Sequence, residues 1–206
     1  MSSEDLTARA RIRDAAIDLF AERGFGQATV RDIAQAAGVS SGLLRHHFGS
    51  KDGLREACDE YAMARTAELR SAMLQDGRLS DHTFMGAVQP VAMRLQRYLV
   101  RSLVDNPSPA MFQRMVEAGE DWLAGTDIKT DDPKAYAAVI VAMQIGMFLL
   151  RDQIGQAIGA DLETPAGHLR MLSAAVDIFS QPLLTPEQTA QAQTALARLI
   201  TDKESR

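Results

Sequence analysis

Cysteine is nearly absent from this chain, because Cys58 is the only one among its 206 residues. A lone cysteine excludes a disulfide within the chain and is typical of proteins kept in a reducing cytoplasm. Neither neighbour of Cys58 is basic, so we expect a buried, unreactive thiol, with redox sensing as the alternative. The first 25 residues are charged and lack an apolar stretch, which predicts no signal peptide and a cytoplasmic location.

An excess of basic residues is also missing. The formal net charge is -5 and the isoelectric point is about 5.4, which argues against a surface that binds nucleic acid everywhere. The acidic excess is uneven, because residues 1 to 58 contain eight basic and eight acidic side chains. Any attraction to DNA must therefore come from one local face of this part, and from its duplication in a dimer.

No segment alternates apolar and polar residues convincingly enough to predict a β-strand, and helix-forming residues dominate. We therefore predict an all-α fold. The longest apolar run, residues 135 to 150, has 16 residues with Gln144 inside it. A membrane-spanning helix needs about 20 residues, so the run predicts a central buried helix instead.

Motifs for catalysis and cofactor binding are missing too. The sequence shows no Gly-rich phosphate loop, no cluster with metal-ligand spacing and no nucleophile elbow. The pair His46 and His47 is a poor metal site, because adjacent side chains on a helix point apart. The sequence therefore predicts no enzyme activity, no cofactor and no bound metal.

The most informative stretch that is present is residues 26 to 54, GQATVRDIAQAAGVSSGLLRHHFGSKDGL. Thr29 followed by Asp32 predicts a helix start close to a capping box, with Asp in place of Glu or Gln. Gly38 predicts the end of this helix, because glycine adopts the left-handed conformation that a helix end often needs. Residues at helical spacing give the helix one apolar face, namely Val30, Ile33, Ala34 and Ala37.

A second short helix follows after a tight turn. Ser40 predicts its N-cap and the helix runs from Ser41 to about His47, while Ser50 predicts the cap of a third helix. Two helices joined by a short turn that contains glycine form the helix-turn-helix pattern, in which the second helix lies in the DNA major groove.

The residue types of the second helix suit contact with DNA. Small Ser41 and Gly42 allow the backbone to approach phosphate at the positive helix N-terminus. Arg45, His46 and His47 supply hydrogen-bond donors on the next turn. A helical hairpin of an ordinary bundle is the alternative, and it explains the apolar spacing but not this set of polar residues.

The stretch resembles the DNA-binding domain of TetR-type, or tetracycline-repressor-like, regulators. Their pattern runs roughly T-x-x-x-I-A-x-x-A-G-V-S-x-G-x-x-Y-x-H-F-x-S-K-x-x-L. The chain departs from it at Arg45, where the pattern has a tyrosine that usually contacts phosphate, and an arginine binds either phosphate or guanine. The resemblance covers about the first quarter of the chain. The matching residues are Thr29, Ile33, Ala34, Ala37, Gly38, Val39, Ser40, Gly42, His47, Phe48, Ser50, Lys51 and Leu54.

The resemblance implies a transcriptional regulator, most often a repressor, that binds a near-palindromic site on double-stranded DNA as a homodimer. It implies a three-helix DNA-binding domain over residues 1–53 and a helical-bundle domain for ligand binding and dimerisation over residues 54–206. A second hypothesis, favoured by the acidic isoelectric point, is a helical ligand-binding or scaffold protein that no longer binds DNA. The predicted DNA-binding residues are Thr29, Arg31, Ser40, Ser41, Gly42, Arg45, His46, His47 and Lys51.

Helices are predicted along most of the remaining chain. We expect a frayed tail over residues 1–8, then helices at 7–23, 51 to about 75, 82–105 and 110–123. Pro90 predicts either a kink in the helix at 82–105 or its division into two. Loops are expected at 76–81, 106–109, 125–133, Gly155 and 159–164. Two final helices begin at the caps Thr164-Pro165 and Thr185-Pro186.

These last two helices predict a dimer interface. The first has only a narrow polar side, so its apolar arc exceeds the roughly 100° that a helix with one packed face requires. The second has small alanines on its apolar face, which permit close approach. Two such helices would pair with their copies in a four-helix interface, and deep burial within one chain is the alternative.

Methionines and aromatic residues in the second half of the chain predict a pocket for a small apolar effector, of the kind that the resemblance implies. Met111 with Met115, and Met143 with Met147, each lie one helical turn apart. Plain core packing is the alternative for the same residues. The predicted pocket contains Met111, Phe112, Met115, Trp122, Met143, Gln144, Met147 and Phe148.

Overall fold

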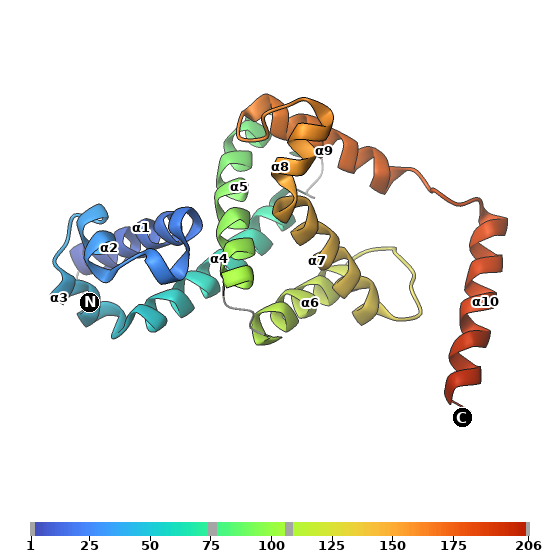
Figure 1. Cartoon of the computed structure of the whole chain (residues 1–206), viewed down its shortest axis with the longest axis horizontal. Helices are drawn as coiled ribbons and strands as arrows, with labels where there is room; N and C mark the ends of the chain where they lie inside the picture. The colour runs from blue at the N-terminus through green and yellow to red at the C-terminus, as the bar shows by residue number, and fades with distance from the viewer. Residues whose placement is uncertain (1–2, 74–77, 106–108, 205–206) are drawn as a thin grey trace. The chain divides into compact units, whose positions relative to one another are not determined.

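The computed structural model of the chain describes residues 3–73, 78–105 and 109–204 (Figure 1). Over these residues the chain is helical and contains no strand, as predicted. It divides into two compact units, Met1–Leu149 and Leu150–Arg206. The first unit contains α1 (Ser3–Gln27), α2 (Val30–Ala36), α3 (Ser41–Phe48), α4 (Lys51–Met73), the 3-10 turn η1 (Arg78–Ser80), α5 (His82–Asp105), α6 (Pro109–Ala124) and α7 (Pro133–Leu149). The second contains α8 (Arg151–Ile158), α9 (Pro165–Ser180) and α10 (Pro186–Glu204).

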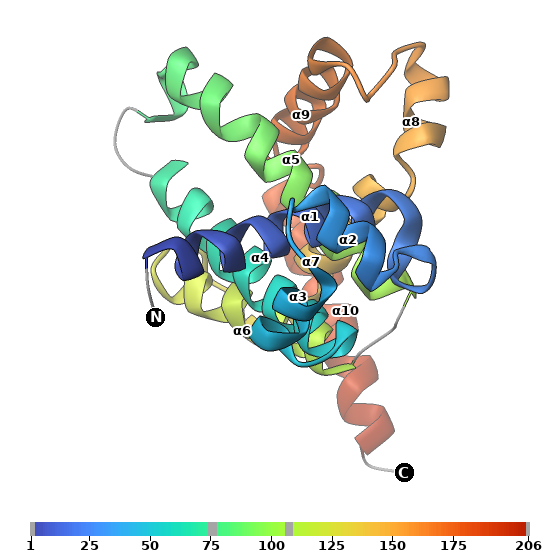
Figure 2. The same ribbon diagram turned by 90° about the vertical axis from the view of Figure 1, so that its left-hand side faces the viewer.

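The main core of the first unit forms where α5 packs on α1 and α4. Ile12 and Ile17 of α1 and Leu95 of α5 are fully buried there. Ile33 of α2 and Leu44 of α3 are fully buried in the same core, and each such side chain stabilises the fold by about 1.5–3 kcal/mol. Figure 2 shows this unit from the side that carries α1, α2 and α3. The three helices are therefore fixed to α4 and α5 through one shared core.

The first helix is longer than the sequence predicts. The prediction of a frayed tail is wrong for residues 3–8, because α1 already begins at Ser3 and Ala8 is buried against the rest of the unit. Residues 1 and 2 lie outside the described part of the chain. The predicted end at Gly24 is confirmed as a break, with φ 79° and ψ 163°, after which a last turn reaches Gln27.

Pro90 does not divide α5, which runs as one helix from His82 to Asp105. The possibility of two short helices is therefore wrong. Proline removes one backbone donor and crowds the preceding turn, but Pro90 itself is exposed. Leu95 and Leu99 on the following turns are buried in the core. This packing stabilises α5 beyond Pro90.

Two predicted loops fall partly outside the described residues. Residues 76–77 of the first and 106–108 of the second belong to the parts that the structure leaves undescribed, and so do residues 74–75 at the expected end of α4. Residues 78–80 form the turn η1 rather than an irregular loop. Pro109, expected in the second loop, is the first residue of α6.

The apolar helix α7 is buried on one side only within the described chain, so the prediction of a central buried helix is wrong there. Ala137 and Val141 are buried against α6, where a Cβ added to Gly119 would lie 3.1 Å from the Cβ of Ala137. Val139 and Met143, in contrast, are 58% and 45% exposed. Among the described residues no single helix is both long and apolar enough to cross a membrane, although α7 and α8 together pass that test.

The second unit contains a helix that the sequence does not predict. Gly155, expected to mark a loop, lies buried inside α8. The helix ends at Gly159, whose φ of 64° is left-handed. Thr164 caps α9 as predicted, with its side chain accepting the Gly167 N–H at 3.2 Å. Thr185 caps α10, and its capping box with Gln188 is confirmed by hydrogen bonds of 2.9 and 3.2 Å.

Candidate nucleic-acid interface

The helix α2 starts at the predicted capping box. The Thr29 hydroxyl oxygen accepts the Asp32 N–H at 3.1 Å, and the Asp32 carboxylate accepts the Thr29 N–H at 3.2 Å. The Thr29 hydroxyl also donates to the carboxylate at 2.6 Å, and these contacts with Thr29 lower the pKa of Asp32. The exposed side chain of Thr29 is thus engaged in setting where α2 begins, independently of any contact with DNA.

The turn between α2 and α3 is fixed by backbone contacts. Gly38 has a φ of 64°, a conformation that costs other residues energy. Directly after it, the Val39 N–H donates to the Ala34 carbonyl at 2.9 Å. The Ser40 hydroxyl then accepts the Leu43 N–H at 3.1 Å and caps α3. The turn therefore sets the direction in which α3 leaves α2.

The helix α3 has one side in the core and one side in solvent. Leu44 is fully buried, whereas Gly42, Arg45 and His46 are exposed. His47 is half-buried, with its ring 6.2 Å from that of Phe48. Arg45 and His46, which the sequence assigns to DNA contact, are thus both accessible from solvent.

The first turn of α4 continues the polar surface. The Ser50 hydroxyl accepts the Gly53 N–H at 3.0 Å, as its predicted capping role requires. A Cβ added to Gly53 would overlap the Phe48 carbonyl oxygen, so only glycine allows this close approach between α3 and α4. The cap fixes the start of the helix on which Lys51 stands.

Two basic residues outside the predicted set lie close to this surface. Arg55 of α4 has its Cζ 4.6 Å from the centre of the Phe25 ring, the same ring that lies 4.3 Å from Lys51 Nζ. Arg9 of α1 stacks on Phe48, with its Cζ 5.3 Å from the ring centre. Arg55 follows Lys51 by one helical turn, and this spacing is the signal in the sequence that places both on one side of α4.

The nine predicted DNA-binding residues differ in their exposure to solvent and in the contacts they make. Arg31, Gly42, Arg45 and His46 are exposed, and Ser41, His47 and Lys51 are partly buried. Thr29 and Ser40 are exposed but use their hydroxyl groups as helix caps. Apart from Thr29 and Arg31, the predicted residues lie within α3, its cap and the first residue of α4.

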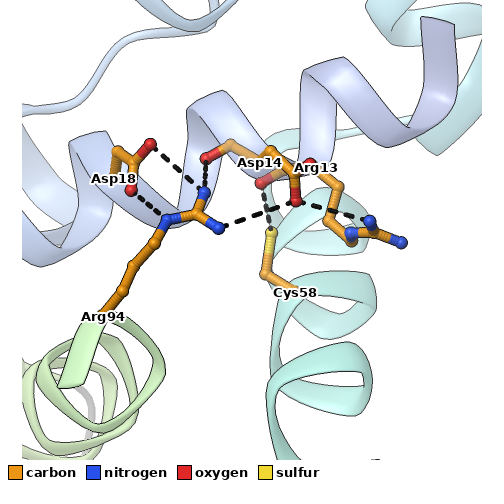
Figure 3. A network of polar contacts seen from close by, with 5 residues as sticks. All are labelled: Arg13, Asp14, Asp18, Cys58 and Arg94. Atoms are coloured by element: carbon orange, nitrogen blue, oxygen red, sulfur yellow. Dashed lines mark hydrogen bonds and ion pairs between the residues drawn. The ribbon is translucent and has the colours of Figure 1, made fainter. Parts of the chain in front are cut away.

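The helix α5 contacts α1 and α4 through a row of polar side chains that we call the α5 polar stripe: Arg94, Tyr98, Arg101, Ser102 and Asp105. Figure 3 shows its first member, Arg94, reaching α1. The Arg94 guanidinium donates to the Asp18 carboxylate and, at 2.8 Å, to the Asp14 carbonyl. Since these stripe residues recur every three or four positions, they lie on one side of the helix.

Two residues in the middle of the α5 polar stripe, Tyr98 and Ser102, form hydrogen bonds with α4. Tyr98, fully buried, donates to the Asp59 carboxylate at 2.6 Å, and Ser102 donates to the same oxygen at 3.0 Å. Asp59 is itself 9% exposed. Burial raises the pKa of the Tyr98 hydroxyl, which therefore remains a donor.

Replacing Tyr98 by phenylalanine is expected to lower the free energy of unfolding by about 1.5–3 kcal/mol, because the buried Asp59 carboxylate loses a donor. Urea unfolding at one fixed protein concentration measures this change. Tyr136→Phe, the same chemical change on α7, is the control. Equal stability of the Tyr98→Phe variant and the unchanged protein would show that this hydrogen bond contributes nothing.

The predicted effector-pocket residues are distributed over several environments of the first unit. Met111 is buried in the core that contains α1, α4 and α5, and Phe112 and Trp122 pack on a smaller cluster formed by Val116, Leu123 and Ala137. Met115 and Met147 are partly buried and Phe148 is buried. Met143 and Gln144 are exposed. The structure therefore does not bring all eight residues together.

Two short capped helices joined by a glycine turn, with Arg45 and His46 outward, define a helix-turn-helix DNA-binding protein. Residues 12–58 match the family model described as bacterial regulatory proteins, tetR family. The chain is 42% identical over 161 residues to the HTH-type transcriptional regulatory protein RaaS of Mycobacterium tuberculosis, a match that covers 73% of this chain and 74% of that protein. The chain belongs to the TetR family of transcriptional regulators and is not an enzyme.

Other relatives agree with this assignment. The HTH-type transcriptional repressor KstR2 of Rhodococcus jostii is 56% identical over 46 residues, 22% of either chain. A TetR-family regulator of Pectobacterium atrosepticum has a similar structure, with a TM-score of 0.53, 23% identity and coverage of 90% of this chain and 98% of that one. A gamma-butyrolactone receptor, described as ArpA-like, has a TM-score of 0.51 and 26% identity, over 71% and 84% of the two chains.

Proposed function

We propose that this regulator is a repressor that binds a near-palindromic operator as a homodimer and leaves it when a small apolar effector binds. The observation that carries the proposal is the outward side of α3, where Arg45 and His46 are exposed on a helix whose Leu44 is fully buried. A helix held by its core side and polar on its other side suits insertion into the major groove.

Within this proposal the predicted residues have separate roles. Arg45 reads a base edge or a phosphate, and Lys51 contacts phosphate at the first turn of α4. Ser41 and Gly42 let the N-terminus of α3 approach the backbone of the DNA. Arg55 and Arg9 join them as further basic residues near this surface.

The dimer would form through α9 and α10 of the second unit. These two helices and the linker between them expose many large apolar side chains, and large exposed apolar surfaces mark interaction sites. Two copies of α3 would need to sit about 34–36 Å apart to read successive major grooves of a near-palindromic site. The exposed apolar residues are Leu169, Val176, Ile178, Phe179, Leu183, Leu184, Leu196 and Leu199.

An effector would act on the part of the chain that follows the DNA-reading helices. We place the functional boundary at residues 53 and 54, so that α4 begins in the DNA-binding domain and continues into the regulatory one. The resemblance to a gamma-butyrolactone receptor supports a small-molecule effector. Such a ligand shifts DNA binding only if it has different affinities for the two states of the protein.

Binding of the purified protein to DNA from upstream of its own gene, compared with random DNA at two salt concentrations, tests the proposal. We expect tight, selective binding that weakens steeply with salt, because phosphate contacts release counterions. Addition of apolar compounds should then release the DNA. Weak binding that is equal for both DNAs, and equal for DNA from neighbouring genes, would favour the hypothesis of a scaffold that no longer reads DNA.

A further inference from the structure

We infer that Phe25 and Asp105 position Lys51 for its contact with a DNA phosphate, and that they connect the end of α5 to this contact. The inference rests on the proposed function at one point, the phosphate contact of Lys51. It adds two residues that do not themselves touch DNA.

The Phe25 ring makes cation–π contacts with two basic side chains, Lys51 and Arg55; we call this ring the platform. Lys51 Nζ lies 4.3 Å and Arg55 Cζ lies 4.6 Å from the ring centre. A cation near an aromatic face is attracted to it by the ring quadrupole. Lysine otherwise carries a flexible four-carbon stem with high rotamer entropy, so the ring restricts the positions of an ammonium group that would otherwise sample many.

The platform is itself held in two ways. The Phe25 ring packs on the buried Phe20, with 5.4 Å between the ring centres. The Phe25 N–H donates to Asp105 Oδ2 at 3.2 Å, and Arg101 Nε donates to the same oxygen at 3.0 Å. Asp105 is the last residue of α5, so the end of this helix holds the turn that carries the ring.

Gly24 shows how closely the side chains of Arg101 and Asp105 at the end of α5 approach this turn. Its φ is 79°, and a Cβ added to it would overlap Asp105 Oδ2. Any side chain at residue 24 would therefore push Asp105 away from the Phe25 N–H. The three residues Asp105, Phe25 and Lys51 thus form a continuous line of contacts from α5 to the DNA-facing surface.

The consequence concerns regulation. If the end of α5 moves, the hydrogen bond to the Phe25 N–H breaks and the ring no longer fixes Lys51. The phosphate contact then weakens for every DNA sequence alike, because a phosphate carries no sequence information. A change in the effector domain would in this way reduce total DNA affinity, in addition to any change in the spacing of the two α3 helices.

A double-mutant cycle between Phe25 and Lys51 tests the inference. The full-length chain and the variants Phe25→Leu, Lys51→Ala and the double variant are titrated with a fluorescent duplex of random sequence over a range of salt. Phe25→Leu is expected to weaken binding about two- to fivefold. Lys51→Ala should reduce the salt slope by about 0.9 for each phosphate that is no longer neutralised. In the Lys51→Ala background, Phe25→Leu should have a smaller effect than in the unchanged protein, because only Arg55 then remains on the ring.

A second pair of variants avoids the core packing of Phe25. Asp105→Ala removes the acceptor of the Phe25 N–H and should reproduce the weaker binding of Phe25→Leu. Asp105→Asn keeps an oxygen that accepts this N–H and should bind like the unchanged protein. Phe25→Tyr keeps a ring and should also preserve binding, and thermal melting of each variant separates loss of positioning from loss of fold.

Two outcomes overturn the inference and differ in what they say about the proposed function. If Lys51→Ala weakens binding but the effects of Phe25→Leu and Asp105→Ala simply add to it, the platform does not position Lys51, while the phosphate contact stands. If Lys51→Ala leaves affinity and salt slope unchanged, the phosphate contact itself is absent and the proposed role of Lys51 fails as well.

Discussion

Replacing Arg45 by alanine is expected to weaken operator binding roughly thirtyfold or more. A good bidentate contact to a base is worth about 1–3 kcal/mol, and a dimer loses it in both half-sites, while each factor of ten corresponds to about 1.4 kcal/mol. Arg45 is exposed on α3, so its replacement should leave the core intact. Titration of labelled operator DNA, with melting temperature as a check on folding, measures the effect.

The same variant decides between the two roles of Arg45. If the side chain reads guanine, selectivity over random DNA falls and the salt slope stays nearly constant. If it binds phosphate, binding to both DNAs falls together and the slope shrinks by about 0.9 for each phosphate that Arg45 neutralises. Arg114→Ala, which removes an exposed arginine from α6, is the matched control. Unchanged operator affinity in Arg45→Ala would remove this residue from the interface.

Glutamate at both Phe179 and Leu196 is expected to convert the protein to a monomer and to reduce operator affinity by a factor of about 100 to 10,000, the usual gain from joining two binding modules. Phe179 of α9 is 53% exposed and Leu196 of α10 is 59% exposed, so the single chain loses little packing. In a dimer interface, however, the new carboxylates would lose their hydration without a partner.

Sedimentation measures the oligomeric state, and the same samples are titrated with operator DNA. The control is Ala87→Glu, which adds one carboxylate at an exposed position of α5. A variant that remains dimeric would place the interface elsewhere. A monomer that binds the operator as tightly as the unchanged protein would show that one copy of α3 suffices.

The sequence predicts those parts of the site that depend on residues close together in the chain. The caps of α2 and α3 follow from Thr29 and Ser40, because a cap needs only a side-chain oxygen and an N–H three residues later. Gly38 likewise reveals the turn by its own backbone preference. These local signals are enough to define where the two helices begin and how the turn between them forms.

The parts that sequence does not predict depend on residues far apart in the chain. Nothing near Asp59 indicates that Tyr98 and Ser102 will donate to it, and the contact between Phe25 and Asp105 joins residues 80 positions apart. Local signals also have two meanings. Gly155 lies inside α8, and a Cβ there would lie 2.7 Å from the Ala160 carbonyl oxygen. Glycine is therefore needed for this close approach and does not mark a turn.

The single thiol of the chain lies where α1 meets α4, and this position gives the protein an internal reporter. Cys58 is fully buried and its Sγ donates to the Arg13 carbonyl of α1 at 3.7 Å, while burial raises the pKa of the thiol. A thiol reagent therefore reacts only after α1 has separated from α4. Because no other cysteine competes for the reagent, the labelling rate of the natural sequence records how often α1 separates from α4, with no introduced probe.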